Sequence, residues 1–137
     1  MHKKIKFELE EIEKELKEYE NLLKKVQKKD PDKIEKAALA TILHSFYTGI
    51  EKIFKVISKT KLKYNPTGKS WHKDLLNKMQ REIISEKLYN DLIEYLSFRH
   101  LYRNSYDFSL NWDEMQGLVE NIFDTWKVFK KEIQKLD

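Results

Sequence analysis

Residues 32–61 read DKIEKAALATILHSFYTGIEKIFKVISKTK, and their apolar side chains recur every three or four positions. That period predicts an amphipathic helix with one face turned to a core. Asp32 follows Pro31 and supplies a cap, so we expect the helix to begin there and to run to about Lys61. Gly49 lies within the apolar face, where glycine costs about 1 kcal/mol relative to alanine, and it therefore predicts a close approach by another group. The predicted inward face consists of Ile34, Ala38, Ile42, Phe46, Gly49, Ile53 and either Val56 or Ile57.

Similar patterns flank this helix on both sides. We expect a long helix before it, then, after a turn-rich loop at 64–69, a short helix capped by Ser70 and two more long helices. Ser85 precedes the fourth helix, although Leu88 stands where a capping box would have glutamate. The stripes are Ile5, Leu9, Ile12, Leu16, Tyr19, Leu23 and Val26; Trp71, Leu75, Leu76 and Met79; Leu88, Leu92, Tyr95, Arg99, Tyr102 and Tyr106; and Met115, Leu118, Ile122, Trp126, Phe129, Ile133 and Leu136. Four long helices and one short helix predict an all-α, up-and-down antiparallel helical bundle.

Length and composition restrict the class of protein further. The 137 residues predict a single domain, 1–137, around one core. Three glycines and two prolines are too few turn residues for a sandwich or barrel, and the absence of cysteine excludes disulfides, thiolate metal sites and a cysteine nucleophile. We find no metal-binding motif, no phosphate-binding glycine loop and no stretch approaching roughly 18 apolar residues. We therefore expect a cytoplasmic protein without a membrane segment, metal or cofactor.

The positive charge is concentrated in one part of the chain. Nine basic residues and one acid lie between Lys52 and Arg81, although the net charge of the whole chain is only +4. A basic block of this kind is typical of proteins that bind a phosphate backbone or an acidic protein surface, and a solvated lysine face is the plain alternative. Lys69, His72 and Lys73 are the candidate RNA contacts in this block, with a local hydrogen bond as the alternative role of His72. His2 and His44 indicate no function.

Polar side chains interrupt the apolar pattern of the fourth helix near its end. At helical spacing Arg99, Arg103 and Tyr106 share one side, and His100 pairs with Asn104 one turn away. Guanidinium groups bind phosphate, imidazole titrates near neutrality, and a phenol can stack on a base. The alternative is a solvated helix end, but an arginine in an apolar stripe is typically paired or used.

Three strings carry a family resemblance: SWHKDLL at 70–76, FRHLYRNSY at 98–106 and FSLNW at 108–112. Together with the helical stretch 46–51 they resemble the HepT-like group of the HEPN superfamily. The resemblance implies a small helical toxin of a type II toxin–antitoxin pair. Such a toxin would be a metal-independent endoribonuclease, active as a homodimer with its cleft between protomers, and neutralised by a nucleotidyltransferase-type (MNT) antitoxin.

The family motif is an arginine, then four to six residues, then a histidine, with a tyrosine two positions later. Carried over, Arg99 takes the place of the arginine, His100 that of its polar neighbour, and Tyr106 that of the tyrosine that antitoxins modify with adenylate. Asn104 stands in place of the histidine and cannot exchange a proton near pH 7. His100 could substitute from one helical turn away. The alternatives are a catalytically degenerate partner of a nucleotidyltransferase or of RNA, and an ordinary dimeric scaffold.

Overall fold

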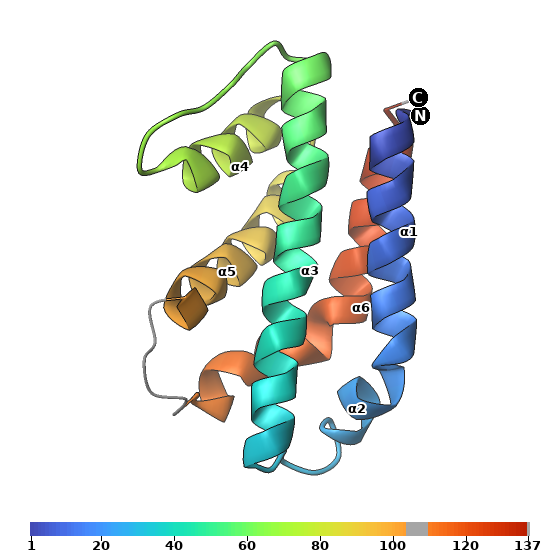
Figure 1. Ribbon diagram of the computed structural model, residues 1–137, viewed down its shortest axis with the longest axis vertical. Coiled ribbons are helices and arrows are strands. Elements are labelled where there is room, and N and C mark those ends of the chain that lie inside the picture. Colours follow the sequence, from blue (N-terminus) through green and yellow to red (C-terminus); the bar gives the residue numbers. More distant parts are fainter. Residues whose placement is uncertain (104–109, 137) are drawn as a thin grey trace.

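The computed structural model describes residues 1–103 and 110–136, and the elements in this part of the chain are all helices (Figure 1). The prediction of an all-α bundle is confirmed. In the described ranges, no helix combines the length and the apolar character needed to cross a bilayer. The helices are α1 (Lys3–Glu18), α2 (Glu20–Lys25), α3 (Lys33–Thr60), α4 (Trp71–Glu82), α5 (Glu86–Arg103) and α6 (Trp112–Gln134).

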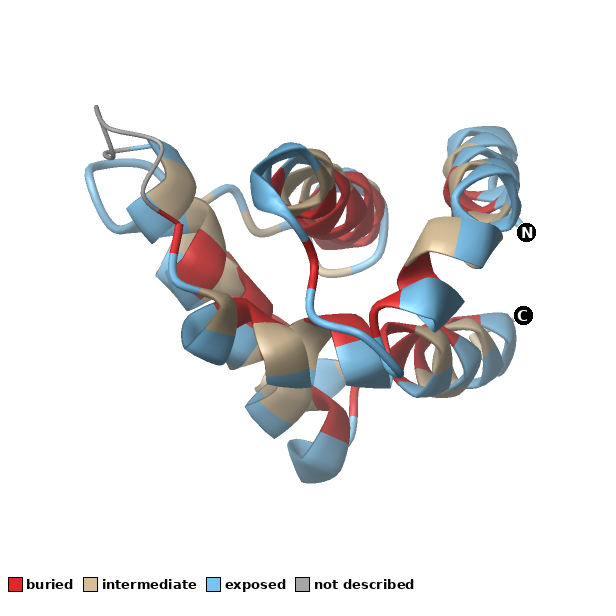
Figure 2. Cartoon of the chain, turned by 90° about the horizontal axis from the view of Figure 1, so that it is seen from below, coloured by how far each residue is buried: buried red, intermediate tan, exposed pale blue. Residues whose placement is uncertain are grey.

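Helix α3 runs through the middle of the bundle. It contacts α1, α4, α5 and α6, with α4 and α5 on one flank and α1 on the other (Figure 1). The buried residues lie on the sides of the helices that face one another (Figure 2). Aromatic rings fill this core, among them Phe46, Phe54, Tyr95 and Phe129. Burying each of these rings stabilises the fold by about 1.5–3 kcal/mol before the entropy cost.

Asp32 begins α3 as predicted, through a complete capping box. The Glu35 amide donates to Asp32 Oδ1 at 2.8 Å, and the Asp32 amide donates to Glu35 Oε1 at 3.0 Å. The expectation that Ile34 faces the core is wrong, because its side chain is 81% exposed. Successive steps of four residues drift by about 40° around a helix, so the series from Ile34 to Phe46 cannot stay on one face.

Helix α1 ends earlier than the predicted first helix. The chain kinks at Tyr19, where the dihedral angles φ −103° and ψ 13° separate α1 from α2. The apolar stripe repeats every 3.5 residues, and such a stripe drifts by about 20° per heptad around a straight helix. The kink returns the stripe to the core, since Leu16 before it and Leu23 after it are both buried, whereas Tyr19 at the kink is 39% exposed and the expectation that it faces the core is wrong.

The start of α5 is fixed by a residue of α6. The Leu88 amide donates to Ser85 Oγ at 3.2 Å, which is the cap that the sequence predicts. The missing glutamate of the capping box is supplied by Glu132, whose carboxylate accepts the Ser85 amide and the Ser85 hydroxyl, each at 2.7 Å. Helix α5 is therefore anchored to α6 at the end opposite its arginines.

Gly49 marks a close crossing of α1 and α3, as predicted. A Cβ atom at this position would lie 2.8 Å from Cγ1 and 2.9 Å from Cδ1 of Ile12. Real Cβ atoms essentially never pack this closely, so a side chain at this position would force Ile12 to shift.

We predict that Gly49→Ala lowers the free energy of unfolding by about 1 kcal/mol, because overpacking costs about 1–3 kcal/mol while the better helix propensity of alanine returns nearly 1. In an Ile12→Ala background the same change should become stabilising. Gly117→Ala is the matched control, since nothing lies within 4 Å of its added Cβ. Urea unfolding of the set checks this, and a Gly49→Ala variant as stable as Gly117→Ala would contradict the crossing.

Candidate functional site

The last two turns of α5 lie against the middle of α3. Arg99 Nε donates to Thr48 Oγ1 at 3.4 Å. One turn later, the Tyr102 and Thr41 hydroxyls share a hydrogen bond of 3.2 Å. The Tyr102 ring also packs on the His44 ring, with centroids 5.0 Å apart and planes tilted by 39°. These contacts join a guanidinium, a phenol and an imidazole into one cluster.

His44 is the titratable centre of this cluster. Partial burial lowers the pKa of His44 below its ordinary value, and the positive charges of Arg99 and Arg103 lower it further. An imidazole with a lowered pKa is neutral at pH 7 and can accept a proton. The junction therefore pairs fixed positive charge with a neutral base, an arrangement that suits an anionic substrate that must lose a proton.

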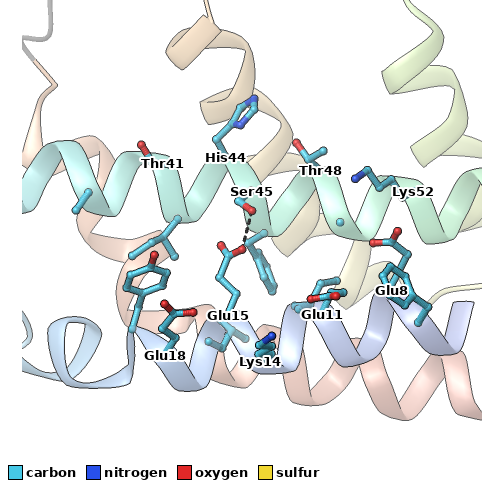
Figure 3. Close-up of a pocket in the computed structure, with 18 residues that line it drawn as sticks. Glu8, Glu11, Lys14, Glu15, Glu18, Thr41, His44, Ser45, Thr48 and Lys52 are labelled. Carbon is cyan, nitrogen blue, oxygen red and sulfur yellow. Dashed lines mark hydrogen bonds between the residues drawn. The ribbon is translucent and has the colours of Figure 1, made fainter.

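The cluster borders a groove of a different character. A groove of about 860 Å³ runs along the contact between α1 and α3, and its α1 wall carries Glu8, Glu11, Glu15 and Glu18 together with Lys14 (Figure 3). Ser45 points into this groove and donates to Glu15 Oε2 at 2.9 Å. In the same view Thr41, His44 and Thr48 line the α3 edge of the groove and point away from α1. Like charges repel, so a phosphate would favour the α5 side of α3 over the acidic groove.

The structure brings together part of the predicted site. Arg99 and Arg103 lie one turn apart on α5, and His100 is exposed about 100° around the helix from Arg99. Arg99 was expected inside the apolar stripe, but Phe98 occupies the buried position and Arg99 lies half-buried at its rim. The remaining motif residues, Asn104 and Tyr106, lie outside the described residues.

The other predicted RNA contacts lie at the start of α4. His72 Nδ1 pairs with Oε2 of the buried Glu51 at 2.7 Å, and the His72 ring stacks on Trp71 with centroids 3.6 Å apart. This is the local hydrogen bond considered for His72 from the sequence, and an RNA contact by this residue stays a prediction. Lys69 and Lys73, which precede and follow Trp71 and His72 in the sequence, are both exposed.

Sequence reasoning missed His44, Thr41 and Thr48. The signal available was their spacing, because polar residues at i, i+3 and i+7 interrupt the most apolar helix of the chain on one side. Their connection to Arg99 and Tyr102 appears only when α3 and α5 are packed together. Within the described ranges, no three His, Cys, Asp or Glu side chains gather closely enough to hold a metal ion.

The fold and the site together define an all-α bundle with a cationic end on α5 packed against a central helix. A family model described as HepT-like protein matches residues 38–137. The chain therefore belongs to the HepT-like family of the HEPN superfamily, whose proteins take part in toxin–antitoxin partnerships. Searches of curated proteins and of solved structures gave no match.

We predict that the lowered pKa of His44 makes stability depend on pH. The unfolded chain binds a proton at His44 more readily than the folded chain, so stability is full above the unfolded pKa near 6.5 and falls as the pH drops through the folded pKa. The His44→Asn variant should therefore lose less stability than the wild type between pH 7.5 and pH 5. Thermal melts of both proteins across this range check this, and equal losses would contradict the shift.

Proposed function

We propose that this chain is the toxin of a HEPN/MNT toxin–antitoxin pair and that it cleaves RNA without a metal ion. The observation that carries the proposal is the cluster of Arg99, Arg103 and His44 where α5 packs on α3. Family membership supports the toxin role, and the clustered positive charge beside a neutral imidazole supports phosphate chemistry. The family further suggests a homodimer and an antitoxin that adenylates Tyr106.

The reaction that fits these groups is attack of a ribose 2′-hydroxyl on the adjacent phosphorus. The new P–O bond forms as the bond to the 5′-oxygen breaks, leaving a 2′,3′-cyclic phosphate and a 5′-hydroxyl. A base removes the 2′-hydroxyl proton, and an acid supplies a proton to the leaving 5′-oxygen. Guanidinium groups stabilise the charge that builds up on the phosphate oxygens. RNA supplies its own nucleophile, so the protein needs only positive charge and proton transfer.

The identity of the proton-transfer group is the open choice at this site. Asn104 replaces the motif histidine and cannot transfer a proton near pH 7. His100 is exposed on another side of α5, whereas His44 lies beside the arginines and is held against Tyr102. We therefore assign the base to His44 and keep His100 as the alternative. If neither histidine transfers a proton, the chain would bind the nucleotidyltransferase or RNA without cutting RNA. The asparagine at position 104 favours this alternative.

We predict that purified protein cleaves single-stranded RNA in EDTA and that Arg99→Ala lowers the rate about 100-fold or more. His44→Gln should lower the rate about 100- to 10,000-fold, because it removes a proton acceptor at nearly constant volume. His100→Gln should change it by less than His44→Gln does. Gel analysis of a labelled oligoribonucleotide over time provides the measurement.

Lys127→Ala serves as the control, because this lysine is exposed on α6, away from the cluster. Equal cleavage by all variants would reveal a contaminating nuclease and refute the proposal. Cleavage that appears only in an Asn104→His variant would instead identify a degenerate site and favour the binding-partner function. If His100→Gln is inactive and His44→Gln is active, the base is His100.

A further inference from the structure

The outward face of α3 continues beyond the α5 junction as a row of lysines. At about 100° per residue, the polar positions of this face stay within an arc of about 80° from the first turns of the helix to its end. The row consists of Thr41, His44, Thr48, Lys52, Lys55 and Lys59. A single strip of α3 therefore connects the arginine cluster to the basic block of the sequence.

The lysine end of this strip opens into a second pocket. Its volume is about 600 Å³, and Lys52, Lys55 and Lys59 line one wall. Lys4 of α1 and the aromatic residues Tyr64 and Trp71 line the others, and Glu8 is the carboxylate among the described lining residues. The pocket thus combines four ammonium groups with two aromatic rings.

Among the described residues, none of the four lysines in this pocket forms an ion pair. Neighbouring lysines of the basic block are engaged elsewhere, since Lys61 donates to the Leu136 carbonyl and Lys78 pairs with Glu82. Like charges one turn apart on a helix repel each other, by a few tenths of a kcal/mol for each pair. An anion in the pocket would remove this repulsion.

Trp71 is held in place as a flat apolar surface. The buried Glu51 carboxylate binds His72, and the His72 ring stacks on the Trp71 indole. The ammonium group of Lys55 lies 4.2 Å from the centre of the Trp71 ring. A flexible lysine over an aromatic ring can swing towards a phosphate while a planar base takes its place on the ring.

We propose that this pocket binds a nucleotide unit of single-stranded RNA, with the three α3 lysines on the phosphates and Trp71 under a base. The choice of RNA rests on the proposed function. RNA is favoured over an acidic protein as the ligand because two aromatic rings line the pocket and because the polar strip of α3 leads from the pocket to Arg99. Lys55 lies about 16 Å along α3 from His44, which corresponds to roughly five stacked nucleotides. The pocket therefore holds the substrate a few nucleotides from the bond that is cut.

The test measures binding of a fluorescent 2′-O-methyl RNA of about ten nucleotides by anisotropy at several salt concentrations. The methylated strand lacks the nucleophile and stays intact in any variant. Lys55→Ala/Lys59→Ala should weaken binding about tenfold or more and reduce the slope of log K against log salt by about two. Trp71→Leu should weaken binding about 5- to 100-fold and leave the slope unchanged. Lys127→Ala/Lys131→Ala removes an exposed i, i+4 lysine pair from α6 and is the matched control.

The outcomes separate this pocket from the nuclease activity. If the α3 pair variant loses RNA binding and the wild type does not cut RNA, the result supports the pocket and refutes the nuclease. Normal binding and cleavage by the α3 pair variant overturn the pocket and leave the nuclease intact. Three other results also overturn the pocket. The first is equal weakening of binding by the two lysine-pair variants, and the second is no RNA binding by the wild type. The third is a lysine-dependent preference for poly-glutamate over RNA.

Discussion

Four other helices pack on α3, and this leaves little of the central helix exposed to solvent. Its buried arc is set by α4, α5 and α6, and the crossing at Gly49 brings α1 within contact distance of the backbone. Thr41, His44 and Thr48 lie on the strip of α3 that is left between α1 and α5. Because His44 and Thr48 lie on that strip, the packing of α3 also decides which side chains meet the arginines of α5.

Electrostatics divide the two sides of this strip. The α1 wall of the groove is acidic, and the end of α5, on the other side of the strip, carries Arg99 and Arg103. Opposite signs on the two sides direct an anion to α5 and away from α1. The family match begins at residue 38, so the acidic helix lies outside it. The negative charge on α1 thus limits the direction from which an anion can approach the arginine cluster, whose residues lie in the matched part of the chain.

Periodicity and local chemistry were enough to predict most of the fold. The cap at Asp32 and the crossing at Gly49 follow from neighbouring residues and from the cost of glycine in a helix, and the structure confirms both. Ile34 was misplaced because counting in steps of four ignores the angular drift of the helix. The kink at Tyr19 has a related cause, since a stripe of period 3.5 cannot follow a straight helix.

The site was harder to predict because its contacts join residues far apart in the chain. Arg99 and Thr48 are 51 positions apart, and no helical pattern within α5 indicates which residue of α3 it will meet. The sequence identified the arginines from the polar interruption of the apolar stripe in α5, and the structure added the histidine beside them. His44 alone, in an apolar helix, resembles a core residue, and only the packed structure shows that partial burial and two nearby guanidiniums lower its pKa.

The bond between Glu132 and Ser85 bears on how the protein is made. Glu132 lies 47 positions after Ser85, and it completes the first turn of the helix that carries Arg99 and Arg103. A ribosome has released the whole of α5 before Glu132 emerges. The nascent chain therefore carries its arginines on an incompletely anchored helix until α6 has been made and packed.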